Sequence, residues 1–183
     1  LGQSEASLIV TGDLNIAGLA RKIAIIDCDV HHGDGTASIF TGDSSVFTAS
    51  LHCEDNWPRE KPPSDLDVGL AKGEGDAAYL KALTGLVDQV FARSEPDLVF
   101  YNAGVDPHAD DRLGLLRLTD DGLRERDRRV AEACRSRAVP LVGVLGGGYE
   151  KDAGAVARRH SFMVDALAAI TAPDRRAALP SPH

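Results

Sequence analysis

The stretch "KIAIIDCDVHHGDG" (22–35) places an apolar run directly before a dense group of acidic and histidine side chains. Residues 23–26 are Ile and Ala only, which is typical of a strand that is covered on both faces of a parallel sheet. In open parallel sheets, ligands bind outside the carboxyl ends of the strands. The polar residues after this run (27–34) are therefore expected to lie at a functional edge of the sheet.

Three more apolar runs predict strands, and three amphipathic stretches predict helices. The strand candidates are "SVFTASLH" (45–52), "DLVFYNAG" (97–104) and "VPLVGVLGG" (139–147), beside 22–30 in the first stretch; the helix candidates are 76–94, 119–137 and 152–170. Thr119 is a suitable N-cap for the second helix. Strands that alternate with helices predict a parallel sheet in one α/β domain over residues 1–170, and the Pro- and Ala-rich tail 171–183 is expected to be disordered.

Composition excludes several classes of protein. The net charge of −8 argues against a nucleic-acid partner, and no apolar run reaches the ~18 residues that a membrane span needs. The three cysteines are sparse and form no C-x-x-C pair, which favours a reducing compartment. We therefore expect a cytoplasmic protein with no membrane or nucleic-acid partner.

A metal site is the chemistry that the polar stretch favours. Asp29 and His31 stand two residues apart, so on a strand they share a face, with Asp27 one step deeper. Asp106 follows another predicted strand and is a candidate for a third ligand. Two carboxylates and one imidazole with an open position suit a catalytic Zn²⁺, and Fe²⁺ accepts the same ligands.

Each of these signals is weak when it stands alone. Asp-x-His is common by chance, and the glycines before Tyr149 are by default a tight turn, because no Lys-Ser/Thr follows them as in a phosphate loop. The other histidines are expected to be ordinary core or surface residues: His32, His52, His108 and His160.

Four motifs together resemble one known family. "DCDVHHGDGT" (27–36), "TASLH" (48–52), "YNAGVDPHADDRLGLLRLT" (101–119) and "LGGGY" (145–149) resemble, in order and spacing, the zinc-dependent histone deacetylase-like amidohydrolases of the arginase/deacetylase superfamily. The form is most similar to the small class IV and acetoin-utilisation-type bacterial members. The resemblance covers about residues 22–170 and implies a three-layer α/β fold, with a mostly parallel sheet between helices.

The resemblance also implies residue roles. It implies that Asp29, His31 and Asp106 bind Zn²⁺. It also implies that Tyr149 donates a hydrogen bond to the oxyanion that develops during the reaction. A structural K⁺ is expected beside the metal ligands, and further residues are expected to orient the site or line the substrate channel. The cation-site and orienting residues are Asp27, Asp34, Ser50 and Leu51, and the channel residues are Gly147, Gly148 and Trp57, although core packing explains Trp57 equally well.

The implied reaction is hydrolysis of the acetyl amide of acetyl-lysine or of a small acetylated amine. Arginases carry a second-metal Asp where this chain has Gly33, which disfavours a dinuclear, arginase-like hydrolase. The family's general acid–base is a pair of adjacent histidines before the metal-binding strand, and no histidine precedes His31 here. A catalytically impaired or non-catalytic metal-binding relative is therefore the alternative.

The missing histidine pair leads us to expect that the chain lacks an N-terminal part. In that interpretation "TGDLNIAGLARKIAIID" (11–27) is a shortened remnant of a helix that precedes the metal-binding strand in the family. A sheet without its N-terminal strands should expose an apolar edge. We expect the chain to self-associate through that edge.

Overall fold

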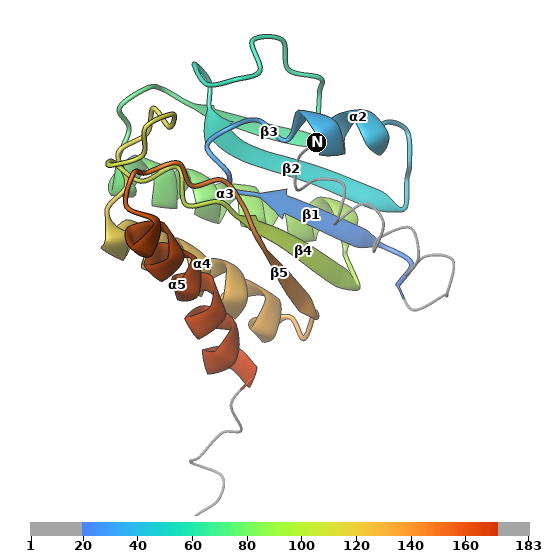
Figure 1. The fold of residues 1–183 in the computed structure, drawn as a ribbon. Helices are drawn as coiled ribbons and strands as arrows, with labels where there is room; N and C mark the ends of the chain where they lie inside the picture. Colours follow the sequence, from blue (N-terminus) through green and yellow to red (C-terminus); the bar gives the residue numbers. More distant parts are fainter. Residues whose placement is uncertain (1–19, 172–183) are drawn as a thin grey trace, which may run out of the picture.

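The computed structural model describes residues 20–171, which form a five-stranded sheet with four helices (Figure 1). The strands are β1 (Ile23–Asp27), β2 (Val46–Cys53), β3 (Leu66–Leu70), β4 (Leu98–Ala103) and β5 (Leu141–Leu145). The helices are α2 (Asp34–Ile39), α3 (Asp76–Ser94), α4 (Asp120–Ser136) and α5 (Ala153–Thr171). Residues 11–19 of the predicted remnant helix (11–27) lie outside the described residues. The predicted tail (171–183) also lies outside them, except for Thr171, which ends α5.

All neighbouring strands are parallel, in the order β3-β2-β1-β4-β5. β1 is central, and Asp27 at its end pairs with Ser50 of β2 and Asn102 of β4. The carboxyl ends of the strands therefore meet at one edge, as the alternation of strands and helices predicts. β3 and β5 are the two outer strands of the described sheet.

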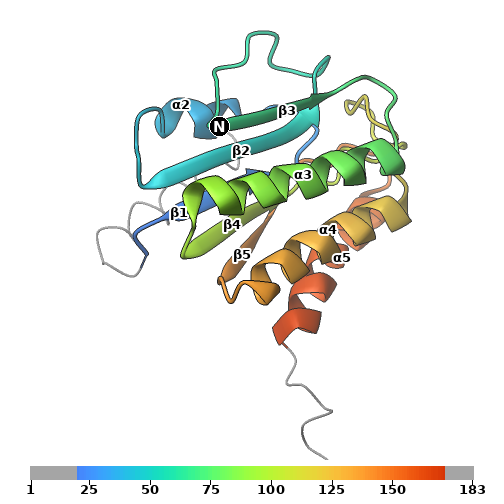
Figure 2. The same cartoon turned by 180° about the vertical axis from the view of Figure 1, so that it is seen from behind.

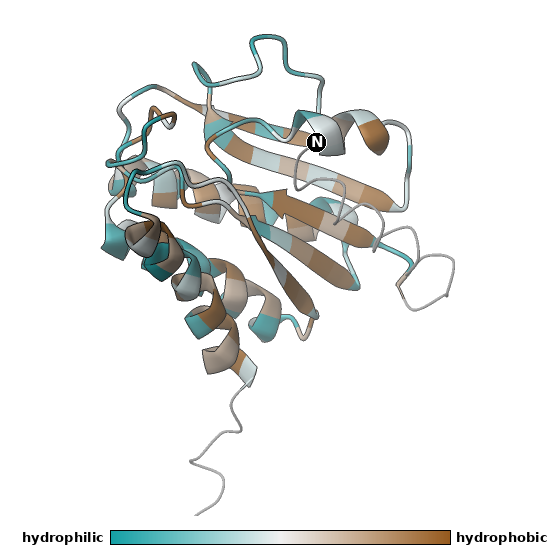
Figure 3. Ribbon diagram, viewed as in Figure 1, coloured by the Kyte–Doolittle hydropathy of each residue, from teal (hydrophilic) through white to brown (hydrophobic). Residues whose placement is uncertain are grey.

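Apolar side chains cover both faces of β1, which explains its unbroken apolar run. Ala24 and Ile26 join the main core, which contains buried residues of α3 and α4. Ile23 and Ile25 point to the opposite face and pack with Val46, Leu98 and Phe100. Figure 2 shows α3 and α4 over one face of the sheet, and α2 lies on the other; Figure 3 shows the strands as the most hydrophobic part of the ribbon.

The three long helices agree with the predicted ranges, because each has a clear start and an apolar face. Thr119 caps α4 by accepting a hydrogen bond from the Gly122 N–H (3.0 Å), and it donates its own hydroxyl to Asp76 Oδ2 at the start of α3 (2.7 Å). Phe162 and Met163 of α5 are buried in the main core. Within the described part, no helix is both long and apolar enough to cross a membrane.

The sequence-based assignment is wrong at three places. β1 ends at Asp27 rather than at residue 30, so the acidic and histidine residues lie in the loop that follows the strand. β3 was not predicted, because its five residues "LDVGL" are only partly buried and contain a glycine. α2 was not predicted either, because its six residues "DGTASI" are too few to show a helical period.

Candidate metal centre

The loop after β1 is held by its own aspartates. The Asp29 N–H donates to Asp27 Oδ1 (3.0 Å), and the His31 N–H donates to Asp29 Oδ1 (3.0 Å). Such bonds from a short acidic side chain to the backbone two residues on fold the chain tightly. Asp29 and His31 therefore come together through two successive turns and not through the pleat of a strand, as the sequence suggested.

The structure brings the three predicted ligands together. One ligand atom each from Asp29, His31 and Asp106 lies within 4.8 Å of the others. His31 Nδ1 is 2.9 Å from Asp29 Oδ1 and 3.0 Å from Asp106 Oδ2. Asp106, in the loop after β4, is completely buried and accepts a hydrogen bond from the Val30 N–H (2.8 Å). Two loops from neighbouring strands thus present three ligand groups to one point.

The glycine turn after β5 closes the group from a third side. The Gly147 N–H donates to Asp29 Oδ2 (2.6 Å), and the Gly147 carbonyl accepts from the Val105 N–H (2.7 Å). A Cβ at position 147 would overlap Asp106 Oδ2 and would lie 2.7 Å from Asp29 Oδ2. Glycine is therefore required here because the backbone contacts both carboxylates directly.

Tyr149 lies at the open side of this group. Its side chain is 43% exposed, and its ring centroid is 6.0 Å from that of His31, nearly perpendicular to it. The Tyr149 N–H donates to Asp111 Oδ2 (2.7 Å), which fixes the backbone. Partial burial and the nearby Asp29 and Asp106 carboxylates raise the pKa of the phenol, so it stays a hydrogen-bond donor.

The electrostatics of the three ligands favour a cation between them. Burial, and then the charge of Asp29, raise the pKa of Asp106 well above its usual range. Burial alone would lower the pKa of His31, but the hydrogen bonds to Asp106 and Asp29 outweigh it and raise that pKa to about 10. Two buried carboxylates this close need a positive partner, which is a proton on His31 or a metal ion. The donor set therefore fits a divalent metal.

The residues expected at a monovalent-cation site lie around the turn from Asp27 to Asp29, in the loop after β1. Asp27 is buried and accepts from Asn102 Nδ2 (3.0 Å); burial, then the charge of Asp29, raise its pKa to about 7. Ser50 Oγ accepts a long hydrogen bond from the Gly33 N–H (3.4 Å). Leu51 points into the main core, so only its backbone is available to an ion. Asp34 is exposed at the start of α2 and is not part of the three-ligand group.

The two remaining channel candidates occupy different environments. Trp57 is 71% exposed, which excludes core packing as its role. Gly148 packs on the side of the core: a Cβ there would lie 2.7 Å from Val105 Cγ2 and 2.8 Å from Val156 Cγ1. Close packing within the protein accounts for the absence of a side chain at position 148.

Sequence reasoning missed three residues that support the site. Asn102 binds Asp27, and Asp111 accepts from the Tyr149 N–H. Arg126 of α4 is completely buried and donates to the carbonyls of Gly104 (2.5 Å) and Cys28 (3.4 Å). These two hydrogen bonds hold the loops after β1 and β4 together. Arg126 lies in the charged stretch "RERDRR" (124–129), which in sequence looks like an ordinary solvated helix face.

Residues 8–164 match the family described as the histone deacetylase domain, and the chain belongs to this family. It is 47% identical over 155 residues to an uncharacterised protein of Picosynechococcus sp., with 85% of this chain and 52% of that protein covered. It is 34% identical over 159 residues to a probable deacetylase of Archaeoglobus fulgidus, covering 81% and 44% of the two chains. A histone deacetylase-like amidohydrolase of Pseudomonas aeruginosa is 31% identical over 143 residues, with 72% and 38% covered.

Solved structures agree on the fold. A histone deacetylase homologue from Aquifex aeolicus superposes with a TM-score of 0.73 at 26% identity, covering 88% of this chain and 45% of that one. The acetylpolyamine aminohydrolase of Burkholderia pseudomallei superposes with a TM-score of 0.70 at 21% identity, covering 85% and 47%, and supports the fold alone. The predicted α/β deacetylase-like fold is confirmed. The chain spans about half the length of these relatives.

Proposed function

We propose that this chain carries the metal-binding part of a zinc-dependent amide hydrolase, which removes acetyl groups from acetyl-lysine or a small acetylated amine. The observation that carries the proposal is the convergence of Asp29, His31 and Asp106 within 4.8 Å beside the exposed face of Tyr149. Membership in the histone deacetylase family and the names of the deacetylase and amidohydrolase relatives support the reaction class.

A zinc ion bound there would supply Lewis-acid polarisation of the amide carbonyl and activation of a water molecule. The residues of this chain perform the other tasks. Tyr149 donates its phenolic proton in a hydrogen bond to the carbonyl oxygen, where negative charge develops. The Gly147 N–H fixes Asp29, and the Val30 N–H fixes Asp106, so both carboxylates keep their orientation.

A dinuclear, arginase-like site is disfavoured by the surroundings of Gly33. A Cβ at position 33 would lie 2.7 Å from Asp27 Oδ2, so an aspartate there would require the buried Asp27 carboxylate to move. A single ion per catalytic centre therefore fits the packing better.

The second candidate function is metal binding without turnover. The lack of a histidine that could act as general acid–base favours it for this chain in isolation. Amide hydrolysis needs a group that takes a proton from water and gives one to the leaving amine. His31 is committed to the metal group, and no histidine precedes it in the sequence. We propose that this chain alone binds zinc but turns over an acetyl-lysine substrate only negligibly.

The proposal is tested by zinc titration of the metal-free chain, with Asp106→Asn as the probe. Removing one charged ligand should weaken zinc binding at this centre by more than about tenfold, because one of three ligands loses its charge. Asp88→Asn is the matched control, since Asp88 is an exposed residue of α3 that pairs with Arg137 (3.2 Å). Calorimetry measures the affinity, and circular dichroism verifies folding.

Each candidate function has a result that would contradict it. Equal zinc affinity in Asp106→Asn and the wild-type chain would exclude the metal centre. Measurable hydrolysis of an acetyl-lysine reporter that Asp106→Asn abolishes would contradict the second candidate function, because the chain would then supply its own general acid–base.

A further inference from the structure

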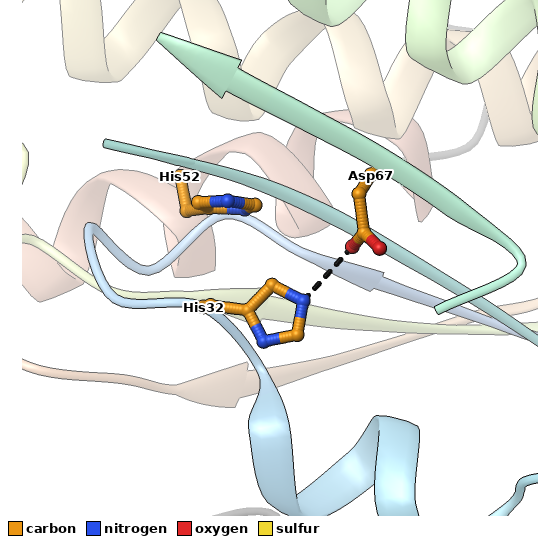
Figure 4. Close-up of side chains that lie close together, drawn as sticks. All are labelled: His32, His52 and Asp67. Atoms are coloured by element: carbon orange, nitrogen blue, oxygen red, sulfur yellow. Dashed lines mark hydrogen bonds and ion pairs between the residues drawn. The ribbon is translucent and has the colours of Figure 1, made fainter. Parts of the chain in front are cut away.

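A second group of metal-ligand side chains lies on the opposite half of the sheet from β4 and β5. One ligand atom each from His32, His52 and Asp67 lies within 4.8 Å of the others. Figure 4 shows the two imidazoles and the carboxylate close together. His32 Nε2 lies 3.0 Å from Asp67 Oδ1. The imidazole rings of His32 and His52 are 4.7 Å apart, centre to centre. Among the described residues, this group and the first centre alone have such spacing.

The strand register explains why these residues meet. β2 and β3 pair in parallel with Ser50 opposite Asp67 and His52 opposite Gly69. Side chains two residues apart on a strand share a face, so His52 and Asp67 lie on the same face of neighbouring strands. His32 comes from the loop after β1, directly after His31, yet the two adjacent histidines join different groups.

Internal hydrogen bonds do not account for the burial of two imidazoles side by side. The side chains of His32 and His52 are 0% and 1% exposed. Nδ1 of His32 is buried and has no hydrogen-bond partner within the part of the chain that the structure describes. That atom lies on the side of the ring away from Asp67 (Figure 4), so the ligand atom that His32 offers to this group is Nε2. Two imidazoles buried beside a carboxylate cost free energy, which a cation bound between the three groups would offset.

The surroundings suit a metal ion that enters from solvent. Ser50 Oγ lies 3.0 Å from His52 Nδ1. In the tautomer in which the Nδ1–H donates to Ser50 Oγ, Nε2 of that ring keeps a free lone pair for a metal ion. Asp67 is 32% exposed and Glu54 is 65% exposed, and Glu54 Oε2 lies 3.7 Å from His52 Nε2. Gly69 keeps space for this carboxylate, because a Cβ there would overlap Glu54 Oε2. Two buried imidazoles therefore face exposed carboxylates at the outer strand.

We propose that His32, His52 and Asp67 form a second metal site for a divalent transition ion such as Zn²⁺, with Glu54 available as a fourth ligand. Two histidines and a carboxylate are a typical zinc ligand set. The ion would replace the hydrogen of the His32 Nε2–Asp67 Oδ1 hydrogen bond (3.0 Å), and that proton would be released to solvent. This site is separate from the Asp29–His31–Asp106 centre and does not depend on the reaction proposed for it.

The test measures zinc stoichiometry in a background that lacks the first centre. Metal-free wild-type chain is titrated with Zn²⁺ by calorimetry, and bound zinc is counted by mass spectrometry after gel filtration. We expect two equivalents in the wild type and one in Asp29→Asn/Asp106→Asn. Adding His52→Gln to that background should remove the remaining equivalent, and adding Asp67→Asn should weaken it by about tenfold or more.

Asp65→Asn is the matched control, because Asp65 is also exposed, lies two residues from Asp67, and accepts from the Thr48 N–H (2.8 Å) instead of a histidine. It should leave the stoichiometry and the affinity unchanged. Asp67→Asn keeps an oxygen acceptor for His32, so it provides a folded variant even where His52→Gln does not fold.

The outcomes separate this proposal from the first. A background variant that binds no zinc, beside a wild type that binds one equivalent, would overturn the second site and leave the first intact. One equivalent in both proteins would support the second site and contradict the first. An unchanged affinity in Asp67→Asn would also overturn the second site.

Discussion

At the scale of single residues, the candidate centre depends on close contact between backbone and carboxylates. Asp106 is completely buried beside Asp29, and the charge of each is compensated by His31 and by backbone N–H groups. Gly147 contributes one of these N–H groups at a distance that excludes a side chain. The centre therefore tolerates little change in the glycine turn.

Gly147→Ala should weaken zinc binding at the first centre and destabilise the chain by about 1–3 kcal/mol, because the added Cβ overlaps the Asp106 carboxylate. Calorimetry and urea denaturation measure the two effects. Gly85→Ala is the control: nothing lies within 4 Å of its Cβ position on α3, and alanine there should stabilise the helix by about 0.5–1 kcal/mol. Equal behaviour of the two variants would refute the packing argument.

His52 predicts a pH dependence of stability in the metal-free chain. Burial, and then the neighbouring His32, lower the pKa of His52 from 6.5 to about 4. Between these pH values the unfolded chain binds a proton at His52 that the folded chain does not. The free energy of unfolding is therefore highest above pH 6.5 and decreases as the pH falls toward 4. His52→Gln should reduce the loss by about 1–3 kcal/mol.

Denaturation in the presence of a chelator, at a series of pH values between about 4 and 7.5, measures that difference. Asp88→Asn is the control, since Asp88 is an exposed residue of α3 that pairs with Arg137 (3.2 Å), away from both candidate metal sites. His108→Gln should reduce the loss of stability at low pH in the same direction as His52→Gln, because burial also lowers the pKa of His108. Parallel curves for wild type and His52→Gln would contradict the assigned shift.

At the scale of elements, the start of α4 connects two helices. Thr119→Ala removes the hydrogen bond from the Gly122 N–H and the bond to Asp76, so it should cost about 1–2 kcal/mol in unfolding free energy. Ser161→Ala serves as control, because its exposed hydroxyl donates only to the Arg158 carbonyl of the same helix, 2.7 Å away. A cost for Thr119→Ala no larger than that of Ser161→Ala would exclude a capping role.

At the scale of the whole molecule, β5 is an outer strand that exposes apolar side chains. Val142 is 39% exposed and Leu145 is 50% exposed. An uncovered edge strand offers unpaired backbone groups to another chain, so we expect self-association through β5. Val142→Lys/Leu145→Lys should lower the association constant, since charge on an edge opposes pairing.

Sedimentation velocity over a range of concentrations measures this association. Val164→Lys replaces a residue of α5 that is 55% exposed and should leave the association unchanged. A wild-type chain that stays monomeric at all concentrations would contradict the edge interpretation.

The sequence alone determined the class of fold and the identity of the ligand candidates. The apolar runs mark four of the five strands, since strands buried on both faces leave a continuous pattern, and Thr119 marks the start of α4. The partly exposed β3 and the six-residue α2 left no such pattern. Motif order indicated that Asp29, His31 and Asp106 belong together.

Only the tertiary structure decided how those residues meet. Asp29 and His31 converge through side chain–backbone turns, which a periodic pattern does not encode. His32, His52 and Asp67 lie in three separate segments, and their proximity follows from the pairing of β2 with β3 and from the path of the first loop. Proximity between distant segments depends on register and packing, and a single sequence shows neither.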